Sequence, residues 1–301
     1  MNAPSSKVLI SGSSGLIGVA LCPVLTRRGY QITRLVRRQS ASEGQILWAP
    51  ETPLARESVS GFDAVVHLAG ETIVGRWTSA KKTAIHNSRV LGTKNLAEAV
   101  AKAPRRPAVF VSASAIGYYG DRGGEILREE SASGAGFLPE VCREWEAATN
   151  AAADAGIRAA QMRFGIVLSA AGGALAKMLT PFRLGLGGKM GSGRQWWSWI
   201  DLQDVIGAIV HVMKNSAVSG AVNVVSPNPV TNAEFTRVLA SVLSRPAVFP
   251  MPGFMARLAL GEMADELLLA SQHVIPAKLL ASGYVFQQSE LQNSLRAILR
   301  N

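Results

Sequence analysis

The stretch Lys7-Val-Leu-Ile-Ser-Gly12-Ser-Ser-Gly15-Leu-Ile-Gly18 decides the fold of this chain. The apolar run at 7–11 predicts a buried strand, and apolar residues at helical spacing over 15–29 predict the helix that follows it. Glycine is needed where the chain turns tightly, where its backbone approaches a pyrophosphate, and where the helix packs on the strand. The free N–H groups at the start of such a helix attract phosphate. We therefore expect a dinucleotide site built from Gly12, Ser13, Ser14, Gly15, Leu16, Ile17 and Gly18, with a tight turn that binds no ligand as the alternative.

Strands and helices alternate along the next 150 residues. Further strands are predicted at 31–36, 45–48, 63–69, 107–112 and 158–167, with long helices at 78–103 and 139–156. Strands separated by helices imply right-handed crossovers between parallel neighbours. The sequence therefore predicts an α/β fold of the Rossmann type, with a doubly wound parallel sheet.

The second predicted strand ends in Val36-Arg37-Arg38. Folds that select NAD place an acidic residue at this point to hold the ribose hydroxyls. No acid lies near this strand end, and two arginines suit the additional 2′-phosphate of NADP. We expect NADP as the cofactor, with two exposed surface arginines as the alternative.

After about residue 170 the alternation changes. A glycine-rich stretch at 185–193 is followed by a predicted helix at 201–214 and a strand at 221–225, and the pattern Thr231-Asn-Ala-Glu234 predicts a capped helix start. We expect residues 1–170 to form the NADP-binding domain. Residues 171–301 are expected to form a smaller α/β, mostly helical substrate or lid domain, interleaved with the first.

Composition and charge narrow the range of partners. The chain has 301 residues, of which 48% are hydrophobic and 17% charged, and its net charge is +10. Residues 201–301 hold as many acids as bases, so the excess of positive charge lies in the first 200 residues. This pattern indicates either a solvated basic surface or a site for an anionic small ligand. No Lys/Arg run exceeds two residues, so we expect a small-molecule substrate and no nucleic acid.

Three further classes are excluded by pattern. No apolar run approaches the ~20 residues of a membrane helix, so no membrane partner is expected. The segment Met1–Lys7 shows no signal-peptide pattern, and a cytoplasmic monomer or homodimer is expected. The two cysteines, Cys22 and Cys142, exclude a disulfide framework, and no cluster has the spacing of metal ligands.

Four motifs together resemble the extended short-chain dehydrogenase/reductase superfamily. They are Gly12-x-x-Gly15-x-x-Gly18, Asp63-x-x-x-His67-Leu-Ala-Gly70, Leu91-Gly-Thr-x-Asn-Leu96 and Phe110-Val-Ser-Ala-Ser114. More narrowly, Gly117-Tyr-Tyr-Gly120, Trp145-Glu146 and the tail Leu279-Leu-Ala-Ser-Gly-Tyr284 resemble an atypical branch that is NAD-dependent epimerase/dehydratase-like. That branch carries a C-terminal module of unknown function, here at about 250–298.

The resemblance implies further residues around the cofactor. Val36 and Arg37 would flank the adenosine ribose, the residues after the fourth strand would pack on the cofactor, and those after the sixth would border the nicotinamide. Arg89, which stands where many relatives have an asparagine, would hydrogen-bond the cofactor or a bound anion. The full set is Val36, Arg37, Arg38, Leu68, Ala69, Gly70, Arg89, Ser112, Gly165 and Ile166.

The positions implied for catalysis depart from the superfamily pattern. Relatives use a Ser or Thr near the end of the fifth strand, then a Tyr and a Lys four residues apart on the next helix, which move a proton as hydride moves. Ser114 matches the first position, but Leu138 and Cys142 fall at the other two. Glu71 and Tyr118 are the candidates to replace them, with Tyr119 beside Tyr118.

A substrate site is expected in the glycine-rich stretch at 185–193 and the residues that follow it. Lys189 and Arg194 suit an anionic group and Trp196 suits a flat or sugar-like one, whereas a linker anchored by its tryptophans is the alternative. We expect an NADP(H)-dependent oxidoreductase or epimerase without the usual Tyr-x-x-x-Lys pair. A nucleotide-sugar-like substrate is the class that the resemblance suggests. The alternative is a non-catalytic, regulatory NADP(H)-binding protein.

Overall fold

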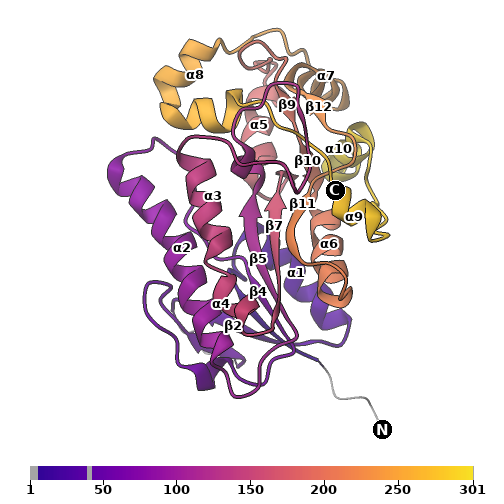
Figure 1. Ribbon diagram of the computed structural model, residues 1–301. Helices are drawn as coiled ribbons and strands as arrows, with labels where there is room; N and C mark the ends of the chain where they lie inside the picture. The colour runs from indigo at the N-terminus through magenta and orange to yellow at the C-terminus, as the bar shows by residue number, and fades with distance from the viewer. Residues whose placement is uncertain (1–5, 39–42, 301) are drawn as a thin grey trace.

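Seven parallel strands form the central sheet of the computed structural model, which describes residues 6–38 and 43–300 (Figure 1). The expectation for the first residues of the chain concerns mostly 1–5, which lie outside the described residues. Across the sheet the order is β11-β7-β5-β4-β1-β2-β3, and every neighbouring pair is parallel. The strands are β1 Lys7–Ser11, β2 Gln31–Val36, β3 Gln45–Leu47, β4 Ala64–His67, β5 Val109–Ala115, β7 Arg158–Phe164 and β11 Gly220–Val224. The predicted doubly wound fold is confirmed.

Helices cover both faces of this sheet (Figure 1). On one face lie α1 (Leu16–Arg27) and α6 (Leu202–Lys214), and on the other α2 (Ser79–Ala101), α3 (Phe137–Ala147) and α4 (Asn150–Asp154). Successive residues of β1 point to opposite faces, so Val8 and Ile10 pack in the first core while Leu9 packs in the second. A sheet buried on both faces accounts for the nearly continuous apolar runs of its strands.

Three predicted elements end at other residues than expected. The strand predicted over 158–167 ends at Phe164, because Gly165 lies against the Ser198 carbonyl oxygen, 2.4 Å from where a Cβ would stand. After this point β8 (Ile166–Leu168) leaves the sheet and pairs with β10 (Trp199–Asp201). The helix predicted over 139–156 is broken between α3 and α4, and β5 continues beyond 112 to Ala115.

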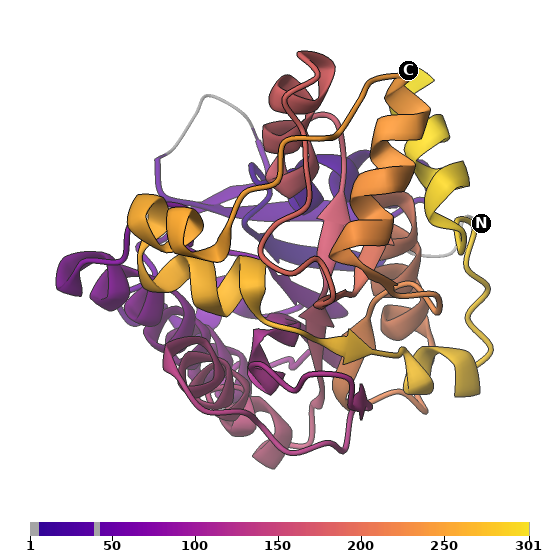
Figure 2. The ribbon, with the colours of Figure 1, turned by 90° about the horizontal axis from the view of Figure 1, so that it is seen from above.

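The second half of the chain lies mostly above the carboxyl ends of the strands, and only α6 and β11 return to the sheet layers (Figures 1 and 2). Thr231 accepts a hydrogen bond from the Glu234 N–H, so the predicted cap of α7 is confirmed. The helices here are α5 Gly173–Arg183, α7 Asn232–Leu243, α8 Gly253–Leu260, η3 Ala264–Leu269, α9 Ala277–Ala281 and α10 Leu291–Arg300. The short elements are η1 Arg56–Val59, η2 Ile116–Tyr119, β6 Ile126–Leu127, β9 Trp196–Trp197, β12 Val230–Thr231 and β13 His273–Val274. Within the described ranges, no helix is long and apolar enough to cross a bilayer.

The buried carboxylate of Asp204 ties α6 to the segment before α10. It accepts the N–H of Gln287 at 2.8 Å, the N–H of Gln288 at 2.9 Å and the Tyr284 hydroxyl at 3.0 Å. Asp204 is fully buried, so its charge depends on these three donors for solvation. One side chain of α6 therefore anchors residues 284–288, which lead into α10.

Replacing Asp204 with Asn should destabilise the fold, because the new amide group faces N–H donors. Hydrogen bonds to a charged group contribute on the order of 1.5–3 kcal/mol, so we expect a loss of about 3 kcal/mol in the free energy of unfolding. Urea denaturation followed by circular dichroism measures it. Asp154→Asn, at an exposed helix end, is the matched control and should change the stability by less than about 0.5 kcal/mol. Equal midpoints for the two variants would contradict this role of Asp204.

Candidate cofactor and substrate site

The glycine turn between β1 and α1 is held by close backbone contacts. Gly12 has φ +71°, and a Cβ there would stand 2.5 Å from the carbonyl carbon of Leu68. A Cβ on Gly18 would stand 2.3 Å from the Gly12 carbonyl oxygen. At Gly15, by contrast, the nearest atom to an added Cβ is the Gly12 oxygen at 3.4 Å, which is tight but not a clash. The chain's own packing therefore demands glycine at 12 and 18, whereas the described residues do not demand it at 15.

The start of α1 is open to an anion. Gly15 is its N-cap and offers no side-chain cap, and the first turn holds no acidic residue. Within the described ranges, no hydrogen bond is made to the N–H groups of Leu16 and Ile17, while Val19 bonds back to Gly15. Uncapped N–H groups and the helix dipole favour negative charge at this point. The residues present therefore fit the pyrophosphate of a dinucleotide.

A cavity of about 400 Å³ beside this turn contains two arginines. Arg34 and Arg38 come from β2 and its end, and Ser13 and Ser14 come from the turn. Within the described part of the chain no acid lines this cavity, whose full lining is Ser13, Ser14, Val19, Cys22, Pro23, Arg34, Val36, Arg38 and Gln45. Val36 and Arg38 thus lie where predicted. Arg37 does not line the cavity, and Arg34 was missed although the two-residue period of a strand places it on the face of Val36 and Arg38.

The residues after β4 border the same turn. Leu68 contacts Gly12, and Ala69 follows it within 2.6 Å of the Gly12 Cβ position. Gly70 faces the guanidinium of Arg89, 3.4 Å from its Cβ position. Arg89 lies at 5.1 Å over the Trp145 ring and donates to the Ile85 carbonyl, and burial lowers the pKa of its guanidinium. The predicted group Leu68, Ala69, Gly70 and Arg89 is thus brought together.

His67 is a buried, neutral histidine beneath the turn. Its Nδ1 lies 2.5 Å from the Ser11 hydroxyl, and its Nε2 has no hydrogen-bond partner in the described residues. Burial lowers the pKa of its imidazole to about 4. The pair joins the last residues of β1 and β4, which carry Gly12 and Leu68, so it positions the turn.

Ser114 belongs to a buried ionic network. Its hydroxyl donates to Glu146 at 2.7 Å, and Glu146 accepts two hydrogen bonds of 2.8 Å from Arg163. Arg163 also donates to the Tyr119 hydroxyl at 2.8 Å. All four side chains are largely buried, and burial raises the pKa of Tyr119 to about 12. This network joins β5, β7, α3 and the loop after β5. Ser112, the other predicted serine of β5, is fully buried and donates to the Ala113 carbonyl.

Tyr118 and Glu71 differ in how they are held. The Arg163 guanidinium lies 3.5 Å over the Tyr118 ring, but the Tyr118 hydroxyl has no hydrogen bond in the part of the chain the structure describes. Glu71 pairs with Lys81 at 2.8 Å, and the hydrogen bond from Lys81 lowers the pKa of its carboxyl. The charges of Arg37 and Arg89 lower that pKa further. Glu71 is therefore held as a carboxylate.

Leu138 and Cys142 carry no proton-transfer chemistry on α3. Leu138 is buried against Gly117, and burial raises the pKa of the Cys142 thiol to about 12. The N–H groups of Phe137 and Leu138 donate to the two carboxylate oxygens of Glu266, at 2.9 and 2.7 Å. Glu266 comes from η3, so the C-terminal module caps the start of α3.

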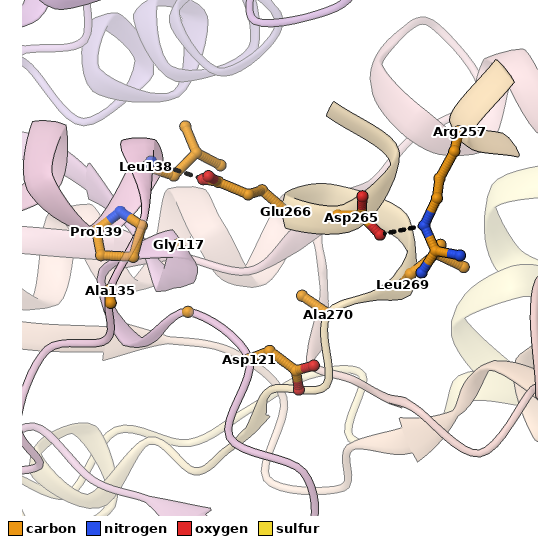
Figure 3. Close-up of a pocket in the computed structure, with 11 residues that line it drawn as sticks. Gly117, Asp121, Ala135, Leu138, Pro139, Arg257, Asp265, Glu266, Leu269 and Ala270 are labelled. Atoms are coloured by element: carbon orange, nitrogen blue, oxygen red, sulfur yellow. Dashed lines mark hydrogen bonds and ion pairs between the residues drawn. The ribbon is translucent and has the colours of Figure 1, made fainter. Parts of the chain in front are cut away.

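A cavity of about 240 Å³ opens at that junction (Figure 3). Asp121 of the loop after β5, Leu138 of α3 and Glu266 of η3 line it, and Arg257 pairs with Asp265 at its far side. Sequence reasoning missed Asp121 and Glu266, because no motif signals a contact made across about half the chain. Within the described ranges no group of side chains could hold a metal ion.

The glycine-rich loop shows a mixed outcome. Lys189 and Arg194 are exposed and form no ion pair among the described residues. Trp196 stacks on His273 with ring centroids 3.9 Å apart, so one of its faces is covered. Gly165 and Ile166 lie at the junction of β7 and β8, above the sheet. None of the three loop residues lines the cavity at the start of α3.

The glycine turn and the sheet order define a dinucleotide-binding protein of the short-chain dehydrogenase/reductase type. The chain belongs to the NAD-dependent epimerase/dehydratase family, whose model matches residues 8–225, and residues 251–298 match a domain of unknown function. It is 40% identical over 290 residues to epimerase family protein Mb2239 of Mycobacterium bovis, covering 96% of each chain.

Two solved structures are similar over nearly the whole chain. The human epimerase family protein SDR39U1, solved with NADPH, has a TM-score of 0.91 at 35% identity and covers 98% of this chain and 99% of its own. A nucleoside-diphosphate sugar epimerase from Corynebacterium glutamicum has a TM-score of 0.83 at 40% identity. That match covers 98% of this chain and 58% of the Corynebacterium glutamicum chain. The resemblance seen in the motifs is confirmed.

The burial of His67 predicts a pH dependence of stability. Its folded pKa of about 4 lies below the ordinary value of 6.5, so the unfolded chain binds the extra proton first. The stability from neutral His67 is present above pH 6.5 and is lost as the pH falls toward 4, by about 3 kcal/mol. Urea denaturation between pH 4 and 7 should show a smaller loss in His67→Gln than in the unmodified protein.

His86 is the matched control, with the opposite sign. Burial has the largest single effect and lowers its pKa, but the hydrogen bonds to Glu144 and Asn87 and the nearby carboxylate charges together outweigh burial and raise the pKa. Its contribution is present at low pH and is lost as the pH rises, so His86→Gln should not reduce the acid sensitivity. Parallel pH profiles for His67→Gln and the unmodified protein would contradict the buried, neutral state of His67.

Proposed function

We propose that this protein binds NADP(H) and is an oxidoreductase or epimerase of its family. The observation that carries the proposal is the cavity with Arg34 and Arg38 beside an uncapped helix N-terminus. Within the described residues no acid lines this cavity, so a ribose 2′-phosphate meets only cations there. The NADPH in the human relative's structure supports the same choice.

Each part of the site has one task. The N–H groups at the start of α1 hold the pyrophosphate, and Arg34 and Arg38 hold the 2′-phosphate, with Arg37 and Arg89 adding positive charge nearby. When bound, the dinucleotide supplies or accepts hydride. The junction at Gly165 and Ile166 is the proposed border of the nicotinamide. The C-terminal module, which lies above the carboxyl ends of the strands, would exclude water from the site.

Tyr118 is the proposed proton donor in place of the usual tyrosine. Its hydroxyl is free of hydrogen bonds to the described residues, whereas Ser114 and Glu71 are engaged by Glu146 and Lys81. The Arg163 guanidinium lies 3.5 Å over its ring and holds the ring in place. Ser114 would act through Glu146, which holds Arg163, and Glu71 would act through its charge.

The proposed substrate is nucleotide-sugar-like and enters at the start of α3. The cavity there offers carboxylates to sugar hydroxyls, and the exposed Lys189 and Arg194 suit a diphosphate. Trp196 keeps one face for stacking. A regulatory NADP(H)-binding protein without turnover is the second candidate, favoured by the buried Leu138 and Cys142 at the positions of the usual Tyr and Lys.

NADPH should bind more tightly than NADH. Arg34→Ala and Arg38→Ala should each weaken NADPH binding by about tenfold or more, since charge-assisted bonds contribute on the order of 1.5–3 kcal/mol. NADH binding should change little, because it carries no 2′-phosphate. Titration by cofactor fluorescence measures both constants. Arg28→Ala, an exposed arginine at the end of α1, is the control. Equal affinities for the two cofactors would exclude the assigned phosphate site.

Tyr118→Phe should abolish turnover and keep NADPH binding. The phenylalanine ring can still pack under Arg163, so the fold and the cofactor site should be retained. The measurement is NADPH oxidation or NADP reduction on a panel of nucleotide sugars and small carbonyl compounds. Cys142→Ala is the matched variant and should keep any activity found. If Tyr118→Phe turns over like the unmodified protein, the donor lies elsewhere, and if no compound reacts, the regulatory candidate gains.

A further inference from the structure

The loop after α5 and the segment that leads into and forms α8 concentrate the exposed apolar side chains of the described residues. Of the fifteen large hydrophobic residues exposed in the described ranges, eight lie in two short segments. They are Leu184, Leu186, Val248, Phe249, Met251, Phe254, Met255 and Leu258. Phe254 is 66% exposed and Leu258 75%, one turn apart on α8. We call these eight residues the apolar face.

Backbone hydrogen bonds join the two segments into one surface. The N–H of Phe249 donates to the Gly187 carbonyl at 3.1 Å, and that of Met251 donates to the Lys189 carbonyl at 2.9 Å. A Cβ on Gly188 would collide with the Phe249 carbonyl oxygen, which shows how closely the backbones of the two segments approach. Met251 leads directly through Pro252 into α8. The apolar face is therefore contiguous, unlike the single exposed apolar residues of ordinary surfaces.

The same segments carry cations and no acids. No Asp or Glu lies between Asp154 and Asp201, nor between Glu234 and Glu262. Arg183 directly precedes Leu184, and Arg245 lies three residues before Val248. Both side chains are exposed, and in the described part of the chain neither forms an ion pair.

We propose that the apolar face docks on an anionic lipid surface. Charge complementarity selects this occupant, because an apolar face with unpaired arginines beside it matches acyl chains beneath anionic headgroups. A second copy of this chain would bring the same cations against each other. Burial of Phe254 and Leu258 removes apolar area from water, and the cations hold the module at the headgroups. The sequence expectation of no membrane partner rested on the absence of a spanning helix, which surface docking does not need.

Vesicle flotation tests the proposal with the full chain. The protein should float with vesicles of phosphatidylcholine containing 30% phosphatidylglycerol, and not with pure phosphatidylcholine. The binding should weaken on raising the salt from 0.1 to 0.5 M, because salt screens the headgroup charges. Equal flotation with both vesicles, or none with either, would overturn the proposal.

Two pairs of variants separate the apolar from the ionic part. Phe254→Ser with Leu258→Ser should weaken binding about tenfold or more, whereas the exposed Val285→Ser should not. Arg183→Gln and Arg245→Gln should each cost about fivefold, and Arg28→Gln nothing. All six positions are exposed, so thermal melts should coincide. Size-exclusion chromatography decides against a second copy: a dimer that Phe254→Ser with Leu258→Ser makes monomeric would overturn the proposal.

Discussion

The close approach of Gly12 to Leu68 is the constraint on which the rest of the site depends. Because Gly12 has no Cβ, the ends of β1 and β4 can lie in contact. Gly18, at the start of α1, packs against the same turn for the same reason. This packing fixes the direction of α1, so its free N–H groups face the edge of the sheet where the strands end. His67 and Ser11 lie directly beneath and hold the two strand ends in register. A site for phosphate is thus a product of packing rather than of any charged side chain.

The Arg163–Glu146 pair sets what the site cannot do. A buried ion pair costs desolvation, which is offset here by two short hydrogen bonds and by the hydroxyls of Ser114 and Tyr119. Those contacts occupy the groups that would otherwise be free to move protons. Leu138 and Cys142 on α3 are packed and buried. At the edge of this network the Tyr118 ring lies under the Arg163 guanidinium, and the Tyr118 hydroxyl has no hydrogen bond to the described residues, which is why the proposal assigns proton transfer to it.

Local signals in the sequence predict the first half of the fold well. The apolar runs of β1 and β2, the glycine turn and the cap of α7 each depend on residues close in the chain. The strand beyond Phe164 was predicted wrongly, because its apolar residues continue although the Ser198 backbone blocks the path at Gly165. Arg34 was not predicted, because it is not adjacent in sequence to Arg37 and Arg38. It lies on the same face as Val36 and Arg38 through the two-residue period of a strand. Glu266 could not be predicted, since its contact with α3 spans about 129 positions.

The C-terminal module couples its outer surface to the site. Arg257 and Leu258 are neighbours on α8: the first pairs with Asp265 beside the cavity, and the second belongs to the apolar face. Asp265 is followed by Glu266, whose carboxylate accepts the N–H groups of Phe137 and Leu138 at the start of α3. Side-chain contacts thus connect α8, through Asp265 and Glu266, to the start of α3. The C-terminal module forms one wall of the cavity, through Arg257, Asp265 and Glu266. The same module carries Phe254 and Leu258 of the apolar face.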